Sequence, residues 1–149
     1  QRSRNSYIFV LSAQDQTAAR LKRIPLTLPE GAVKSVWSGE GDTMYLCEDY
    51  TVHLQTLDAG DLRGSVRQLS GFDREQLTLM QSRCGDHDRY EWVWTAAGEG
   101  GDVVSRCAVL SDGNFHYALT VTAPAETAGR LTEEWNNIMS TFCLEHKEN

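Results

Sequence analysis

The stretch VVSRCAVLSDGNFHYALTVT, residues 103–122, decides the fold class of this chain. Two runs rich in β-branched and aromatic residues flank the polar segment Ser111–Asn114, a composition typical of two strands around a turn. Asp-Gly at positions 112 and 113 tolerates the positive φ angles of a tight two-residue turn. We therefore predict a β-hairpin in which Leu110 lies opposite Phe115.

This register gives the hairpin one apolar face. The side chains on that face are Val104, Arg106, Ala108, Leu110, Phe115, Tyr117, Leu119 and Val121. All are apolar or aromatic except Arg106, which the register places opposite Leu119. A face of this composition is expected against a hydrophobic core, where a guanidinium group needs a partner.

An amphipathic helix follows the hairpin near the C-terminus. Pro124 suits the first turn of a helix. The apolar residues recur at helical spacing and form one stripe: Leu131, Trp135, Ile138, Met139 and Phe142. We expect this stripe to cover the apolar face of the hairpin, because each surface can be buried only against another element.

The residues before the hairpin supply further strands and one more helix. Strands are expected at residues 7–11, 24–28, 44–48, 50–57, 77–84 and 90–96. Pro25 and Pro29 place the second of these at a sheet edge, because proline cannot donate to a central ladder. Asp61 and Gly71 are suited to begin and end a short helix. Tyr90, Trp92 and Trp94 would extend the apolar face of the hairpin, so that all four strands from residue 77 onward form one meander.

Length and composition indicate a single domain. The chain has 149 residues, of which 40% are hydrophobic and 23% charged, values typical of an ordinary globular protein. We expect a partly loose N-terminal segment at residues 1–23, with a helical turn within 12–23, and a single domain at residues 24–145. No apolar run approaches the roughly 18 residues of a membrane-spanning helix, so no transmembrane segment is expected in this chain.

Charge restricts the class of partner. The net charge is −7 and the pI about 5.0, whereas a protein that binds nucleic acid needs a basic surface. Nucleic acid and anionic membranes are therefore not expected partners. The chain begins at Gln1 rather than Met, and we expect that an N-terminal targeting or anchoring segment lies outside it.

The four cysteines leave the redox state open. Cys47, Cys84, Cys107 and Cys143 allow three pairings, and their wide spacing is unlike that of a zinc ribbon or a thioredoxin-type site. Disulfides would indicate an oxidising compartment. The alternative is that all four are buried thiols that pack as small apolar groups.

The whole pattern resembles the PsbP-like family. The residues that carry the resemblance are DGNFHYALTV at 112–121, Pro124, the helix from Trp135 to Phe142, and LTLPEG at 26–31. The resemblance implies an α+β sandwich, an antiparallel meander covered by a C-terminal amphipathic helix. The family includes an extrinsic photosystem subunit, a Ran-binding yeast protein and many bacterial lipoproteins, and it carries no catalytic signature.

Two groups of residues are candidates for a site. Cys84, Asp86, His87 and Asp88 bring a thiol, an imidazole and two carboxylates into one predicted turn, a donor set that could hold a metal or activate a nucleophile. The second candidate is a ligand site at Arg106, with Trp94 stacked beside it and His116 on the following strand. The structural alternatives are ordinary turn composition, an Arg106 side chain that reaches water and a half-exposed His116.

The function that these observations favour is non-catalytic. We expect a binding or assembly domain at a bacterial cell surface, extracytoplasmic and tethered as a lipoprotein, with an unidentified protein partner or small ligand. No motif for a cofactor is present in the sequence, and none is expected. Two alternatives stay open: a small enzyme or metal site at the Cys84–His87 turn, and a cytoplasmic protein-interaction domain.

Overall fold

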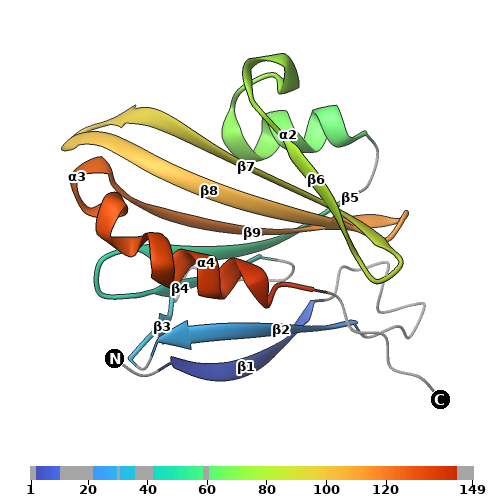
Figure 1. The fold of residues 1–149 in the computed structure, drawn as a ribbon, viewed down its shortest axis with the longest axis horizontal. Coiled ribbons are helices and arrows are strands. Elements are labelled where there is room, and N and C mark those ends of the chain that lie inside the picture. Colours follow the sequence, from blue (N-terminus) through green and yellow to red (C-terminus); the bar gives the residue numbers. More distant parts are fainter. Residues whose placement is uncertain (1–2, 11–21, 30, 36–41, 59–60, 144–149) are drawn as a thin grey trace.

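The computed structural model describes residues 3–10, 22–29, 31–35, 42–58 and 61–143 (Figure 1). Its main strands are β3 (Val33–Lys34), β4 (Asp42–Leu46), β5 (Thr51–Asp58), β6 (Met80–Cys84), β7 (His87–Gly98), β8 (Gly101–Ser111) and β9 (Phe115–Pro124). Within the described residues they form one antiparallel sheet in the order β3-β4-β5-β9-β8-β7-β6. The α+β class and the antiparallel meander of the last four strands are confirmed.

A separate two-stranded hairpin lies beside this sheet. It consists of β1 (Ser3–Val10) and β2 (Lys22–Pro29), paired antiparallel. Pro25 lies opposite Tyr7 in this hairpin, and β1 is the one partner of β2 among the described strands, which confirms the edge position. Leu28 of β2 belongs to the main core. The hairpin crosses the expected boundary at residue 23, and most of the expected helical turn at 12–23 lies outside the described residues.

Helices cover both faces of the sheet (Figure 1). On one face lies α2 (Leu62–Ser70), capped by the Asp61 side chain and ended by Gly71 in the left-handed conformation at φ 81°, as predicted. The 3₁₀ turn η1 (Arg74–Gln76) follows it. On the other face lies the C-terminal run of α3 (Ala125–Ala128), η2 (Gly129–Leu131) and α4 (Thr132–Ser140).

The C-terminal helix forms the larger core, as predicted. Its whole stripe is buried: Leu131, Trp135, Ile138, Met139 and Phe142. The stripe packs with the predicted face of the hairpin, from which Ala108, Leu110, Phe115, Tyr117, Leu119 and Val121 are buried in the same cluster and Val104 packs partly buried against it. The C-terminal helix therefore covers the apolar face of β8 and β9.

The β8–β9 register differs from the prediction by two residues. Leu110 lies opposite Tyr117 rather than Phe115. The cause is the Asp112 carboxylate, which accepts hydrogen bonds from the backbone N–H groups of Asn114 and Phe115, each at 2.8 Å. The turn is therefore centred on Gly113-Asn114. A shift of two residues preserves the side-chain alternation, so the residues that share a face stay the same.

The prediction that Tyr90, Trp92 and Trp94 extend this face is wrong. Gly98 lies opposite Gly101, which places Trp92 opposite Cys107 and Glu91 opposite Ala108. The tryptophans therefore point to the α2 side. There Trp92 is buried with Val66, Cys107, Val109 and Ala118, and Trp94 packs partly buried against them. The register depends on the two-residue turn after Gly98, and the glycine-rich sequence at 98–101 did not specify it.

One disulfide joins the sheet edge to the C-terminal segment. Cys84 of β6 bonds to Cys143, just beyond α4, with the Cα atoms 5.8 Å apart. Cys47 and Cys107 are free, and Cys107 is fully buried. Of the two hypotheses for the cysteines, the structure supports the oxidised one for this pair alone.

We expect reduction of this disulfide to destabilise the fold. Because the bond closes a loop across a sequence separation of 59 residues, its loss should lower the free energy of unfolding by about 2–4 kcal/mol. Urea denaturation with and without reductant measures the change. Cys84→Ser should abolish the sensitivity to reductant and Cys47→Ser should keep it. Equal urea midpoints of the wild type in both conditions would contradict the prediction.

Candidate functional site

Arg106 has its partner, Glu91, on the neighbouring strand β7. Its Nε donates to Oε2 of Glu91 at 2.7 Å, and Nη1 of Arg89 donates to Oε1 of the same carboxylate at 2.9 Å. The side chains of Arg89, Glu91 and Arg106 are only 14%, 9% and 19% exposed. One carboxylate therefore lies between two guanidinium groups in a partly buried cluster.

The two arginines hold Glu91 in its charged form. Burial alone would raise the pKa of Glu91, but the hydrogen bonds and charges of Arg106 and Arg89 outweigh it and hold the pKa below its ordinary value. The carboxylate is ionised at neutral pH, so the cluster carries one net positive charge.

A groove lies between this cluster and α4. It has a volume of about 420 Å³ and is lined by Arg89, Glu91, Arg106, Asn136, Met139 and Ser140. Nη2 of Arg89 donates to the backbone carbonyl of Met139 at 2.8 Å. This bond ties the C-terminal end of α4 to β7 and fixes one wall of the groove.

The sheet beyond the groove is uncovered on the same face. Val93 lies opposite Arg106, and Met80 lies opposite Glu91. Both are large apolar side chains exposed to solvent, at 53% and 59%. We call the surface formed by Met80, Arg89, Glu91, Val93 and Arg106 the arginine shelf.

The structure separates the three residues of the predicted ligand site. Trp94 lies on the opposite face from Arg106 and stacks on Trp92, with ring centroids 6.0 Å apart. His116 is also on the α2 face and is buried rather than half-exposed. The interpretation that Arg106 simply reaches water is wrong too, because Glu91 pairs with it.

His116 belongs to a buried polar pair beneath α2. Its Nδ1 lies 2.6 Å from the hydroxyl of Ser65, and the two residues are 5% and 4% exposed. Burial lowers the pKa of His116, although the charges of Asp112 and Asp61 act in the opposite direction. A serine and a histidine enclosed in this way cannot contact a substrate. The pairing joins residues 51 apart in the chain, and no sequence motif indicated it.

We expect the fold to lose stability at acidic pH because of His116. Its pKa is lower in the folded than in the unfolded chain, so the unfolded state binds more protons below pH about 6.5. The free energy of unfolding should therefore fall as the pH drops from about 7 to 5. Denaturation at a series of pH values measures this fall, and His116→Gln should reduce it. An identical fall in the wild type and in His116→Gln would refute the assignment.

The residues of the predicted metal-binding turn have other partners or lie apart from one another. Cys84 is in the disulfide, and Asp88 pairs with Arg83 at 3.0 Å. His87 is buried opposite Cys84 in the β6–β7 ladder, whereas Asp86 is exposed. No group of three His, Cys, Asp or Glu residues able to hold a metal ion is found in the described part of the chain. A thiolate ligand at Cys84 would require the reduced form.

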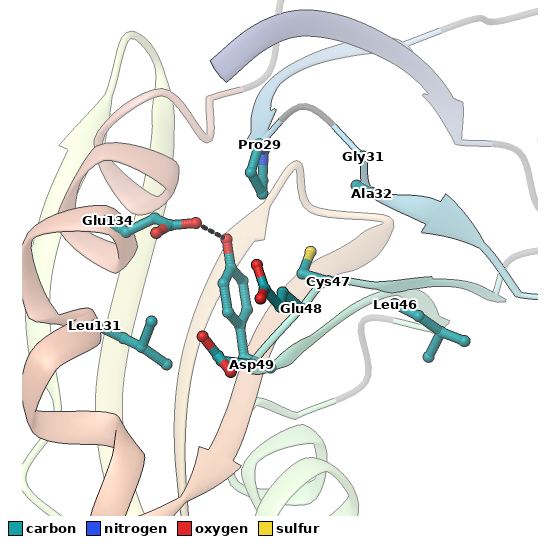
Figure 2. Close-up of a pocket in the computed structure, with 10 residues that line it drawn as sticks. Pro29, Gly31, Ala32, Leu46, Cys47, Glu48, Asp49, Leu131 and Glu134 are labelled. Atoms are coloured by element: carbon teal, nitrogen blue, oxygen red, sulfur yellow. Dashed lines mark hydrogen bonds between the residues drawn. The ribbon is translucent and has the colours of Figure 1, made fainter. Parts of the chain in front are cut away.

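A second cavity lies where β2, the β4–β5 turn and the C-terminal helix meet (Figure 2). Its volume is about 320 Å³, and its lining consists of Pro29, Gly31, Ala32, Leu46, Cys47, Glu48, Asp49, Tyr50, Leu131 and Glu134. The Tyr50 hydroxyl donates to the Glu134 carboxylate at 2.5 Å. Three carboxyl groups make this cavity acidic, unlike the arginine shelf.

The thiol in this cavity is a weak nucleophile. Burial raises the pKa of Cys47 to about 11; a hydrogen bond with Tyr50 acts to lower it, and the Glu134 charge acts to raise it. The pKa of Tyr50 is also raised, first by burial and then by its bond to Glu134. Both groups are therefore protonated at neutral pH, and the thiolate is the reactive form of cysteine.

We expect Cys47 to react slowly with iodoacetamide. At pH 8 a thiol with a pKa of about 11 has roughly a hundredfold less thiolate than an ordinary cysteine with a pKa near 8.5–9. The alkylation rate, followed by intact mass, should rise about tenfold per pH unit between pH 7 and 9. Glu134→Gln should speed the reaction, because it removes a charge that raises the pKa. Labelling of the native wild type as fast as in denaturant would contradict the expectation.

Comparisons with known proteins identify the fold. No protein-family model matches the chain, and no curated protein sequence matches it significantly. Solved structures do match. One is LpqN of Mycobacterium tuberculosis, described as involved in cell envelope biogenesis, at 12% identity and a TM-score of 0.58 over 97% of this chain and 92% of that one.

A second match is the cyanobacterial PsbP protein CyanoP of Synechocystis, at 11% identity and a TM-score of 0.57 over 95% of this chain and 93% of that one. A third, from Bacteroides thetaiotaomicron, has 17% identity and a TM-score of 0.54. That match covers 86% of this chain, which spans 46% of the Bacteroides chain.

The helices in the described residues are all too short or too polar to cross a membrane. The arrangement of the sheet and the C-terminal helix, together with the matching structures, establishes the fold that the sequence pattern resembled. The chain has a PsbP-like fold.

Proposed function

We propose that this chain is a non-catalytic binding domain of a bacterial cell envelope, located outside the cytoplasm, and that its binding surface is the arginine shelf. The observation that carries the proposal is the combination of a positively charged groove with uncovered apolar side chains. Arg89 and Arg106 share the single carboxylate of Glu91, while Val93 and Met80 are exposed beside them. Exposed apolar groups next to partly buried arginines are typical of protein interfaces.

The chemistry of the other candidate residues supports a non-catalytic role. Cys84 is in a disulfide. Ser65 and His116 are enclosed beneath α2. The high pKa of Cys47 leaves the thiol protonated at neutral pH. These three groups are therefore bonded, enclosed or protonated.

Two observations support the location outside the cytoplasm. The Cys84–Cys143 disulfide is typical of oxidising compartments, and it disfavours the cytoplasmic alternative. A protein of the same fold, LpqN, is described as involved in cell envelope biogenesis. A lipid anchor on the N-terminal side of the domain belongs to the same proposal, as the resemblance to bacterial lipoproteins implies.

Site-specific photo-cross-linking tests the proposal. A photoreactive amino acid at Val93 should yield one defined cross-linked species at the envelope of intact cells. The same group at Gln68 is the control, because that exposed residue of α2 lies on the other face of the sheet. The proposal predicts a Val93-specific product that Met80→Asp weakens. Absence of a product, or the same products from both positions, would refute it.

A further inference from the structure

We propose that the arginine shelf recognises a carboxylate carried by a protein segment with apolar residues beside it, and that Arg106 is the residue that binds the carboxylate. This inference rests on the proposed binding function and names the chemistry of its partner. It follows from the hydrogen-bond donors of the cluster, from its charge and from the apolar side chains at its rim.

Arg106 has hydrogen-bond donors that its bond to Glu91 does not use. A guanidinium group has five N–H donors in a fixed planar arrangement. In the described residues, the acceptor found for Arg106 is Oε2 of Glu91, which takes the Nε proton. The two terminal nitrogens, Nη1 and Nη2, remain available on a side chain that lines the groove and is only 19% exposed. Two parallel N–H groups of this kind match the two oxygens of a carboxylate.

Arg89 differs from Arg106 in this respect. One of its terminal nitrogens donates to Glu91 and the other to the carbonyl of Met139. Its role is to position Glu91 and to hold α4 against the sheet. Both oxygens of Glu91 already accept a bond, so Glu91 fixes the Arg106 side chain in place. A guanidinium that is held in this way loses little conformational entropy when it binds.

The charge of the cluster favours an anion. Two guanidinium groups and one carboxylate leave one positive charge in a site that is largely shielded from water. An unbalanced charge in such a place is costly, and a ligand carboxylate would balance it. The chain as a whole carries a net charge of −7, so this positive groove is a local exception that would not attract polyanions such as nucleic acid.

The rim of the groove favours a protein segment over a free anion. Val93 lies directly opposite Arg106 in the β7–β8 ladder, and Met80 lies opposite Glu91. Their exposed side chains would gain from burial against apolar groups of a partner, at about 25 cal/mol per Å² of apolar surface. Inorganic phosphate or acetate offers no apolar surface to them. An acidic residue flanked by apolar residues would both balance the positive charge of the cluster and bury the exposed side chains of Val93 and Met80.

Titration with matched peptides tests the inference. The probes are the blocked pentapeptides acetyl-Ser-Val-Glu-Val-Ser-amide and acetyl-Ser-Val-Gln-Val-Ser-amide, with acetate and inorganic phosphate as free anions. Binding to the ¹⁵N-labelled full chain is followed by NMR, including the Nε–H signals of the arginines. We expect saturable shifts at Arg106 and Val93 with the Glu peptide, and at least tenfold weaker binding of the Gln peptide and of both anions.

Equal affinity for the Glu and Gln peptides, or no saturable binding of the Glu peptide, would overturn the inference. Phosphate binding as tight as that of the Glu peptide would also overturn it and would indicate a simple anion site. These results are independent of the Val93 cross-link. A Val93 cross-link without a preference for the Glu peptide would support the proposed function and refute only the inference that the partner supplies a carboxylate. A preference for the Glu peptide without a cross-link would refute the proposal of a binding partner at the envelope.

Variants test whether Arg106 is responsible for the preference for the Glu peptide over the Gln peptide. Arg106→Gln should abolish the preference for Glu over Gln, and Arg106→Lys should retain only part of it, because an ammonium group cannot bind a carboxylate bidentately. Arg83→Gln is the matched control: its side chain is 60% exposed, and the register places it on the opposite face of the sheet. The NMR spectrum of each variant reports whether it folds. If Arg106→Gln does not fold, the comparison of the two peptides is made with Arg106→Lys alone. An unchanged preference in Arg106→Lys would overturn the assignment.

Discussion

The structure depends on how the Asp112 carboxylate closes the β8–β9 turn. By accepting the N–H groups of Asn114 and Phe115, it fixes which residue of β8 lies opposite which residue of β9. The register decides which side chains share a face of the sheet, because successive residues in a strand point to opposite sides. Tyr117 also donates to this carboxylate, at 3.0 Å. A slip of one residue would exchange the core that packs under α4 with the core that packs under α2.

The two cores differ in extent, and the difference creates the candidate site. The C-terminal helix covers β5, β9 and β8, but its polar flank ends at the groove where Asn136 and Ser140 lie. Beyond that line, β7 and β6 present Val93 and Met80 to solvent on the same face. Arg106 stands at the boundary between the buried and the uncovered parts of the face. Its position there explains why one arginine interrupts an otherwise apolar pattern.

Local patterns in the sequence were sufficient to predict the elements that carry their own signals. The stripe from Leu131 to Phe142, the caps of α2 at Asp61 and Gly71, and the hairpin around Gly113 each follow from a few neighbouring residues. Contacts that depend on distant pairing were not predictable. Glu91 is ordinary in the sequence, and it becomes the partner of Arg106 only once the turn after Gly98 sets the β7–β8 register. The bond between Cys84 and Cys143 likewise depends on how α4 ends against β6.

The Arg89–Glu91–Arg106 cluster is easier to explain by binding than by stability. Partly buried ion pairs add little to stability compared with apolar side chains of similar volume, because removing each charge from water is costly. The neighbouring positions on the same face, Ala108 and Val121, show that apolar side chains pack well there. A fold under selection for stability alone would gain from extending that apolar surface to the sheet edge. Instead Arg106 is held by Glu91, and among the described residues its terminal nitrogens have no acceptor, an arrangement that the proposed ligand carboxylate would complete.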